Sequence, residues 1–273
     1  MRLNSNVVIT ADLVDFSLLI VEIVMLLTAA ATAIYAYKAY NHQKCRSKKQ
    51  AACELAKYYA EVIIEKYTAI CNVFVMSGYR DYLSKIVFFD EIKDFDKQEL
   101  DNLLFQKSID TKEFFEKSHH FDPLVIFACR MARVYSVKDR RAAIEGTIEM
   151  DEENEKAIVR TAPYIHNDFM QDVTSILNDL EWFSMNCHYG LADEELIYQS
   201  LHQIFLSTVL MLYPIICENN TNNEDKHYTN IIWLFNKWRD RLNHIKNEAF
   251  TKKQKYLKKA EAIKTKVHSG KCV

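Results

Sequence analysis

The pattern of hydrophobic and polar residues begins with one long apolar run. Residues 16–37 carry a single charged side chain, Glu22. At about 1.5 Å of rise per residue, a helix over this run would cross the roughly 30 Å hydrocarbon core of a bilayer. The next most apolar run, residues 206–216, is about half as long and contains Ser207, Thr208 and Pro214. We therefore predict one transmembrane helix near the N-terminus and a buried core helix at the second run.

Behind the anchor, apolar residues recur at the three- and four-residue spacing of a helix. The segments predicted as helices are 47–76, 97–106, 123–135, 162–188, 194–217 and 228–250. No Gly or Pro separates the anchor from the first of them, so we expect one continuous helix there. The highly charged residues 137–157 predict an inserted loop, and a solvated helix over 145–156 is the alternative.

Capping residues mark several of these boundaries. Asp96 is placed to cap the helix that follows it, with Glu99 at the capping-box position. Gly190 is predicted as the glycine that ends the 162–188 helix, and Asp193 as the N-cap of the next helix. Four Gly and three Pro in 273 residues are too few turn formers for many short strands. The sequence therefore predicts an all-α fold, a helical-bundle domain on one transmembrane helix.

The predicted division has three parts: an N-terminal segment with the anchor at 1–43, a cytoplasmic helical domain at 44–250, and a lysine-rich tail at 251–273. Charges flanking the apolar run set its orientation. Arg2 is the only cation before the run, against Asp12 and Asp15, whereas the residues after it are strongly basic. The basic residues are Lys38, Lys44, Arg46, Lys48 and Lys49.

The positive-inside rule then puts the N-terminus outside and the domain in the cytoplasm. We predict a single-pass protein of the inner (cytoplasmic) membrane. A cleaved signal peptide is the alternative, because residues 29–33 resemble small-residue cleavage sites. A signal peptide would, however, carry its positive charge before the apolar core, and that core would be shorter.

Composition argues against several other functions. The seven cysteines are odd in number and scattered, without a C-x-x-C pair, which favours a reduced compartment over a disulfide framework. We find no metal-ligand spacing, no phosphate-binding glycine loop and no nucleophile motif, so we predict no metal and no cofactor. A net charge of −2 argues against nucleic-acid binding by the whole chain.

Two features point to the membrane. Glu22 lies within the predicted span, where an ionisable side chain is costly and tends to face protein or water. It could line a pore or an interface between the anchors of several chains; alternatively, it could reach the outer membrane surface or be protonated. The lysines of the tail alternate with apolar residues at roughly helical spacing: Lys252, Lys253, Lys255, Lys258 and Lys259. They predict a helix that binds anionic lipid headgroups, with RNA, a protein partner or a frayed terminus as alternatives.

Arg239, Asp240 and His244 form the candidate catalytic motif. Their spacing resembles the Arg-polar-x-x-x-His motif of HEPN ribonucleases, a family in which two copies, brought together by dimerisation, act on RNA without a metal. The resemblance implies that Arg239 and His244 contact RNA. Asp240, four residues before His244, could orient the imidazole. The alternative is a solvated helix face that carries the same three residues.

A longer resemblance rests on residues 177–183 (LNDLEWF) and 189–197 (YGLADEELI), followed by a helix with Tyr228, Trp233 and Trp238. The chain resembles a bacterial family of uncharacterised membrane-anchored helical proteins, some of them described as phage abortive-infection proteins. The anchor and the 239–244 motif also resemble the HEPN-like membrane accessory protein of RNA-targeting type VI-B CRISPR systems, which is understood to form a membrane pore.

These resemblances imply a homo-oligomeric effector or accessory of antiphage defence that acts at the membrane, and could form a pore there. They imply RNA or a CRISPR or other defence-system protein as a partner. The alternative function is a membrane-tethered, metal-independent ribonuclease of the HEPN type.

Overall fold

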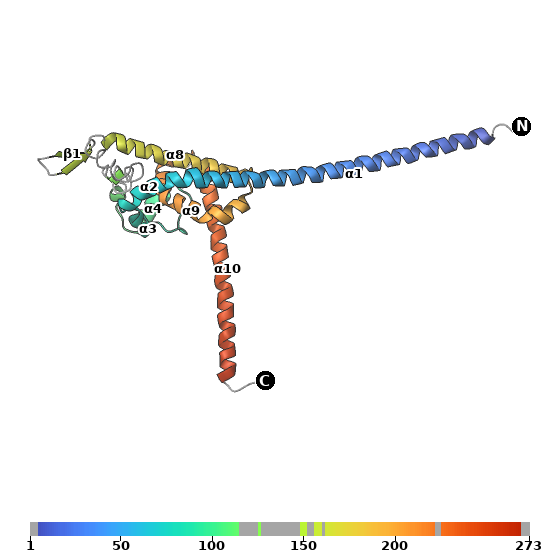
Figure 1. Ribbon diagram of the computed structural model, residues 1–273. Coiled ribbons are helices and arrows are strands. Elements are labelled where there is room, and N and C mark those ends of the chain that lie inside the picture. Colours follow the sequence, from blue (N-terminus) through green and yellow to red (C-terminus); the bar gives the residue numbers. More distant parts are fainter. Residues whose placement is uncertain are drawn as a thin grey trace, which may run out of the picture. The chain divides into compact units, whose positions relative to one another are not determined.

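The structure is a computed structural model that describes residues 5–114, 125–126, 148–151, 156–159, 162–221 and 225–268. Side chains are described for 21–114, 125–126, 167–221 and 225–261. Within these ranges the chain is almost entirely helical (Figure 1), so the predicted all-α class is confirmed. The helices are α1 (Ser5–Tyr58), the π-helix η1 (Tyr59–Ile63), α2 (Ile64–Met76), α3 (Tyr79–Ile86), α4 (Lys97–Gln106), α8 (Ala162–His188), α9 (Glu194–Asn219) and α10 (Thr229–His268).

The chain separates into two compact units, Met1–Ala51 and Ala52–Val273. The first unit holds most of α1, whose described side chains at residues 21–47 are all exposed. Large apolar residues are among them, such as Leu26 (70% exposed) and Leu27 (65% exposed). The helix has no partner within its own unit to cover this surface in the part of the chain with described side chains.

The second unit is a helical bundle built around α8. This helix packs against α2, η1 and α10, while α9 packs against α4 and α10. Phe183 of α8 lies in an aromatic cluster, with its ring centroid 4.8 Å from Tyr59, 5.8 Å from Phe205 and 6.4 Å from Trp238. All four side chains are buried. Tyr59 and Trp238 pack edge-to-face against Phe183, and pairs of this kind add about 0.5–1.5 kcal/mol to the stabilisation from burial alone.

The predicted helix boundaries with capping residues are confirmed. Asp96 and Asp193 accept backbone N–H groups at the starts of α4 and α9. Gly190 has a φ of 62°, and α8 ends at the predicted position. The N–H groups of Gly190 and Leu191 donate back into the last turn of α8, the pattern of a Schellman motif.

The charged segment 137–157 differs from both predictions made for it. Ile148–Asp151 and Lys156–Val159 form strands β1 and β2, an antiparallel pair in which Ile148 lies opposite Val159. The alternation of apolar and acidic residues over 148–151 is a strand signal that the high charge of the segment obscured. The remainder of this segment lies outside the described residues, as does the helix predicted for 123–135 apart from the helical pair 125–126.

α9 is long and apolar enough to cross a membrane by length and composition, yet 67% of its most apolar window is buried. Leu206, Val209, Leu212 and Ile216 are at most 2% exposed. The core helix predicted for residues 206–216 is therefore confirmed.

α10 extends beyond the helix predicted for 228–250, because it continues without a break through the predicted tail to His268. Ile231, Leu234 and Trp238 are fully buried in the bundle. Every described side chain at residues 244–261 is exposed, including Ile245. We call residues 229–243 the core half of α10 and residues 244–268 the α10 extension.

Candidate functional site

The described part of the predicted membrane span is an exposed apolar helix. A window of this helix is apolar and long enough to cross a membrane, and none of that window is buried. The hydroxyls of Thr28 and Thr32 donate to backbone carbonyls of their own helix at 2.8 and 2.7 Å. Neither hydroxyl would therefore present an unpaired proton to lipid. Glu22 is exposed on the same helix.

Arg239 is buried in the domain and binds other residues there, rather than lying on a solvated helix face. Its side chain is 9% exposed, and Nη1 donates to the backbone carbonyl of Ile92, a fully buried residue. Nε and Nη2 donate to Asp240 Oδ1 at 3.0 and 2.8 Å. The guanidinium carbon also lies 5.9 Å from the centroid of the Phe235 ring. Arg239 thus ties the segment between α3 and α4 to α10.

His244 is not joined to the other two residues of the motif. Its side chain is 74% exposed, and its Nδ1 lies 3.7 Å from Glu248 Oε1. The predicted contact from Asp240 to His244 is replaced by the contact of Asp240 with Arg239. The buried Arg239 has turned towards Ile92, whereas His244 lies at the start of the α10 extension. A single chain therefore does not assemble the three residues into one site.

The five lysines predicted to bind lipid all lie on the α10 extension and are exposed. They are Lys252, Lys253, Lys255, Lys258 and Lys259. Lys252 forms a long ion pair with Glu248, 3.9 Å apart and one helical turn earlier. Exposed pairs of this type stabilise a helix by only about 0.3–0.5 kcal/mol. The lysines therefore remain available to an external anionic surface.

Glu181 caps the N-terminus of α10 from the neighbouring helix α8, a role that sequence reasoning missed. Its carboxylate accepts the backbone N–H and side-chain amide of Asn230 at 3.1 and 2.7 Å, and the N–H of Ile231 at 3.0 Å. The first N–H groups of a helix have no partner within the helix, and a carboxylate there also meets the positive end of the helix dipole. Glu181 thereby fixes the point at which α10 begins.

Two carboxylates at the start of α9 hold the core half of α10 further along. Glu194 accepts the indole N–H of Trp238 at 2.6 Å and the ammonium of Lys237 at 2.7 Å. Glu195 forms a two-pronged pair with the guanidinium of Arg241. Hydrogen bonding from Arg241 lowers the pKa of Glu195. All three glutamates belong to the LNDLEWF and YGLADEELI segments, so these segments fasten α10 to the bundle.

A second polar clamp flanks the π-helix η1. The Tyr58 hydroxyl donates to Asp179 Oδ1 at 2.9 Å. The Lys66 ammonium donates to Asp179 Oδ2 at 2.5 Å and to Ser175 Oγ at 2.9 Å. Residues eight apart in an uninterrupted α-helix are about 80° out of phase, at ~100° per residue. The wider i→i+5 turn absorbs one residue. Tyr58 and Lys66 then behave as if seven apart, roughly 20° out of phase, so both reach Asp179.

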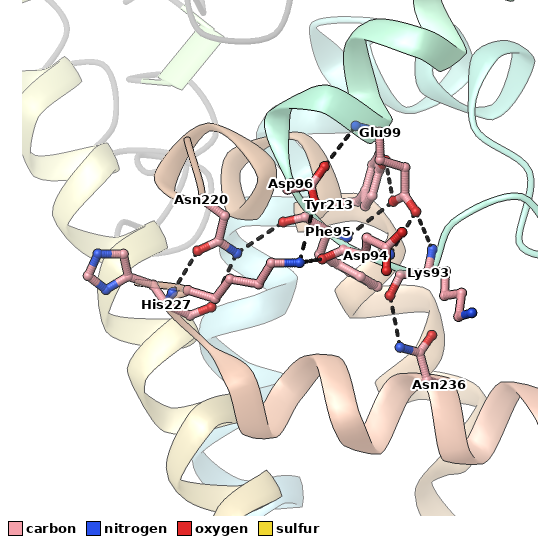
Figure 2. A network of polar contacts seen from close by, with 10 residues as sticks. Lys93, Asp94, Phe95, Asp96, Glu99, Tyr213, Asn220, His227 and Asn236 are labelled. Carbon is pink, nitrogen blue, oxygen red and sulfur yellow. Dashed lines mark hydrogen bonds and ion pairs between the residues drawn. The ribbon is translucent and has the colours of Figure 1, made fainter. Parts of the chain in front are cut away.

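Figure 2 shows a polar network around the segment that precedes α4. The carboxylate of Glu99 accepts the backbone N–H groups of Lys93, Asp94 and Phe95 at 2.6, 2.7 and 3.2 Å, and the hydroxyl of Tyr213 at 2.8 Å. A capping-box glutamate would instead bind the N–H of the N-cap residue itself. Burial raises the pKa of Tyr213, with further contributions from Cys217 and Glu99.

Asn220, at the end of α9, completes this network (Figure 2). Its amide donates to the carbonyls of Phe95 and His227 at 3.0 and 3.2 Å, and its Oδ1 accepts the N–H of His227 at 2.6 Å. Lys226 pairs with Asp96 at 3.3 Å. The side chains of the network thus bind one another and the backbone, so the network has a structural role: it holds these segments together.

A hollow of about 650 Å³ lies beside the network and is lined by polar residues that include Glu91, Asp94, Gln98 and Lys226. Among the residues that the structure describes, no group of three or more His, Cys, Asp or Glu side chains could hold a metal ion. The described residues that line the hollow therefore do not form a metal site.

A model of the family described as Domain of unknown function (DUF4760) matches residues 96–238, just over half of the chain. No curated protein and no solved structure matches the chain. The matched residues run from the N-cap of α4 to Trp238 in the core half of α10. They include the three glutamates that fasten α10, whereas the apolar part of α1 and the α10 extension lie outside them.

Proposed function

We propose a function on the premise that the chain belongs to the family described as Domain of unknown function (DUF4760). In this proposal α1 crosses the inner membrane once, with the N-terminus outside and the helical domain in the cytoplasm. Several chains associate through their anchors, and the assembly acts as an effector or accessory of antiphage defence by making the membrane permeable.

The exposed apolar surface of α1 carries the proposal. Leu26 and Leu27 are 70% and 65% exposed, and the described residues around them are exposed as well. Leaving such surface in water costs roughly 25 cal/mol per Å². A bilayer removes that cost, and the paired hydroxyls of Thr28 and Thr32 are compatible with it. The basic residues that follow the apolar run favour a cytoplasmic domain.

Glu22 supports association of the anchors. An ionised carboxylate that faces lipid is unfavourable by at least ~2.5 kcal/mol near the bilayer centre, and by less near its surface. In a ring of helices the side chain can face water or a neighbouring anchor instead. The resemblance of residues 177–183 and 189–197 to membrane-anchored proteins, some described as phage abortive-infection proteins, supports the role in defence.

Thiol labelling of intact cells tests the topology. A membrane-impermeant maleimide should react with a thiol introduced by Asn4→Cys. Cys45 and Cys53, which are exposed, should react only after the membrane is permeabilised. Burial raises the pKa of the Cys187 thiol to about 12, so this thiol should stay unlabelled in the folded protein. Labelling of Cys45 and Cys53 in intact cells, with protection at position 4, would reverse the orientation.

Association and membrane activity need a second experiment. The detergent-solubilised protein should have the native mass of several chains, and infection should depolarise cells that express it. Glu22→Gln should reduce the depolarisation. Glu61→Gln is the matched control, because Glu61 is an exposed residue outside the predicted span, and it should leave the depolarisation unchanged. A monomer at every concentration, together with an unchanged membrane potential, would refute this part of the proposal.

Among the described residues, no contact favours the ribonuclease alternative. The groups of Arg239 that would face RNA are engaged by Ile92 and Asp240.

A further inference from the structure

We infer that the α10 extension is a second membrane contact, a basic helix that lies on an anionic lipid surface. The proposed function rests on α1. This inference goes beyond it, because it assigns a binding partner to a different element, α10. It depends on that function only in placing the domain beside a membrane.

The α10 extension is a helix without packing over its described side chains. Residues 244–261 are all exposed, among them Phe250 (62%), Tyr256 (70%) and Leu257 (47%). In proteins, most of the stability of a helix comes from packing of its amphipathic face rather than from helix propensity. An external surface that covers the apolar residues would stabilise the helix.

The apolar residues and the lysines are arranged around the helix in a definite order. At ~100° per residue, Ile245, Ala249, Tyr256 and Ala260 fall within an arc of about 60°, and Leu257 and Phe250 lie about 60° and 80° beyond one edge of it. By the same spacing, Lys252 lies about 20° beyond one edge of this arc and Lys253 about 20° beyond the other. Lysines at the margins of an apolar stripe can extend their ammonium groups to headgroups while the stripe enters the membrane interface.

Charge distinguishes this partner from a second copy of the helix. Residues 244–261 contain six lysines against two glutamates, Glu248 and Glu261. Pairing two such helices along the apolar arc would bring the flanking lysines of both chains together, an unfavourable like-charge contact. An anionic surface meets the lysines with opposite charge, and each lysine that reaches it strengthens binding by roughly fivefold. RNA would satisfy the lysines but would leave the apolar arc uncovered.

The core half of α10 holds the extension in place. Glu181, Glu194 and Glu195 fasten that half to α8 and α9. No Gly or Pro interrupts residues 229–268, so the two halves form one continuous helix. The lysines are therefore presented from a fixed base on the domain.

Proteolysis of the full chain in vesicles tests the inference. Chymotrypsin should cut the exposed extension after Phe250, Tyr256 and Leu257 when the chain is reconstituted in neutral phosphatidylcholine vesicles. The fraction cut there measures the chains whose domain faces outward. In vesicles that contain phosphatidylglycerol, we expect this fraction to be cut at least about tenfold more slowly. Raised salt should restore the faster cleavage, because it screens exposed charges.

Two variants that keep the cleavage sites test whether the protection depends on the positive charge of the lysines. Replacing Lys252, Lys253, Lys255, Lys258 and Lys259 with glutamine should abolish the protection. Replacing the same residues with arginine, the matched control, should preserve it. Circular dichroism of both variants shows whether the bundle is still folded.

Three outcomes would overturn the inference. Equal cleavage in the two kinds of vesicle excludes an anionic lipid partner. Protection that depends on protein concentration and not on lipid assigns the extension to a second copy, and protection by RNA alone assigns it to nucleic acid. Flotation after an alkaline carbonate wash tests the α1 anchor separately, since a chain held only by the α10 extension would be washed off while still showing lipid-dependent protection.

Discussion

The guanidinium of Arg239 satisfies a carbonyl that water cannot reach. Ile92 is fully buried, and Nη1 of Arg239 donates to its backbone oxygen. Removing the donor leaves that oxygen without its partner, which costs about 1–3 kcal/mol for a buried polar group. At the scale of single residues, the motif thus contains one buried structural residue, Arg239, and two exposed residues, Asp240 and His244.

Arg239→Ala should lower the free energy of unfolding by about 2–3 kcal/mol, because it removes both the donor and its packing on Phe235. His244→Ala should change it by less than about 0.5 kcal/mol, as is usual for an exposed site. Urea unfolding followed by tryptophan fluorescence measures both. An Arg239→Ala protein of unchanged stability that no longer protects cells would restore the catalytic interpretation of the motif.

Tyr213 makes stability depend on alkaline pH. Its pKa is raised, so folding favours the neutral phenol. The resulting stabilisation is complete below the ordinary tyrosine value of about 10 and is lost as pH rises above it. Tyr213→Phe should lose about 1 kcal/mol at neutral pH and show a shallower decline in melting temperature above pH ~10.

Tyr256→Phe is the matched control, since Tyr256 is 70% exposed. It should melt like the parent protein at every pH. If Tyr213→Phe also follows the parent curve above pH ~10, the Tyr213 hydroxyl does not contribute to the alkaline loss.

At the scale of elements, η1 accommodates one residue more than a regular helix would need. Deleting Glu61, an exposed residue of η1, should convert the π turn to α geometry with Tyr58 and Lys66 still in phase for Asp179. We expect a folded protein that loses less than about 2 kcal/mol. Deleting Thr68, an exposed residue of α2, should instead rotate the flanking segments by ~100° and disrupt the core.

Circular dichroism melts of the two deletion proteins decide between these outcomes. The deletion in α2 is the control for the loss of one helical residue. Equal destabilisation by both deletions would show that η1 does not set the phase of the clamp at Asp179.

The elements that could be predicted from the sequence are those specified by nearby residues. Asp96, Gly190 and Asp193 mark helix ends through contacts a few residues away, and the structure places them accordingly. Glu181 and Asp179 act on partners 49 and 121 residues away, which no local pattern reveals. The burial of Arg239 escaped prediction for the same reason, because its acceptor lies 147 residues earlier in the chain.

At the scale of the whole molecule, burial in the domain begins close to the boundary between the two units. Ala52 and Leu55 are 1% and 4% exposed, whereas the described residues at 21–47 are exposed. A chain that starts at residue 52 should therefore keep the domain fold, with a melting temperature within a few degrees of the full chain. It should also lose resistance to alkaline carbonate extraction.

Circular dichroism and membrane flotation measure these two properties. A truncated domain that aggregates or melts much earlier would show that the N-terminal residues contribute to its stability. Retention in carbonate-washed membranes would locate the membrane anchor elsewhere in the chain.

Because α10 is one continuous helix, a small rotation of its core half would move the far end of the α10 extension by a larger distance. The α10 extension reaches roughly 37 Å beyond residue 243, at ~1.5 Å per residue. A tilt of about 10° at the glutamates that fasten the core half would then sweep the far end through about 6 Å. Small repacking within the bundle would be amplified at the lysines, and a force on the lysines would be transmitted back to Trp238 in the core.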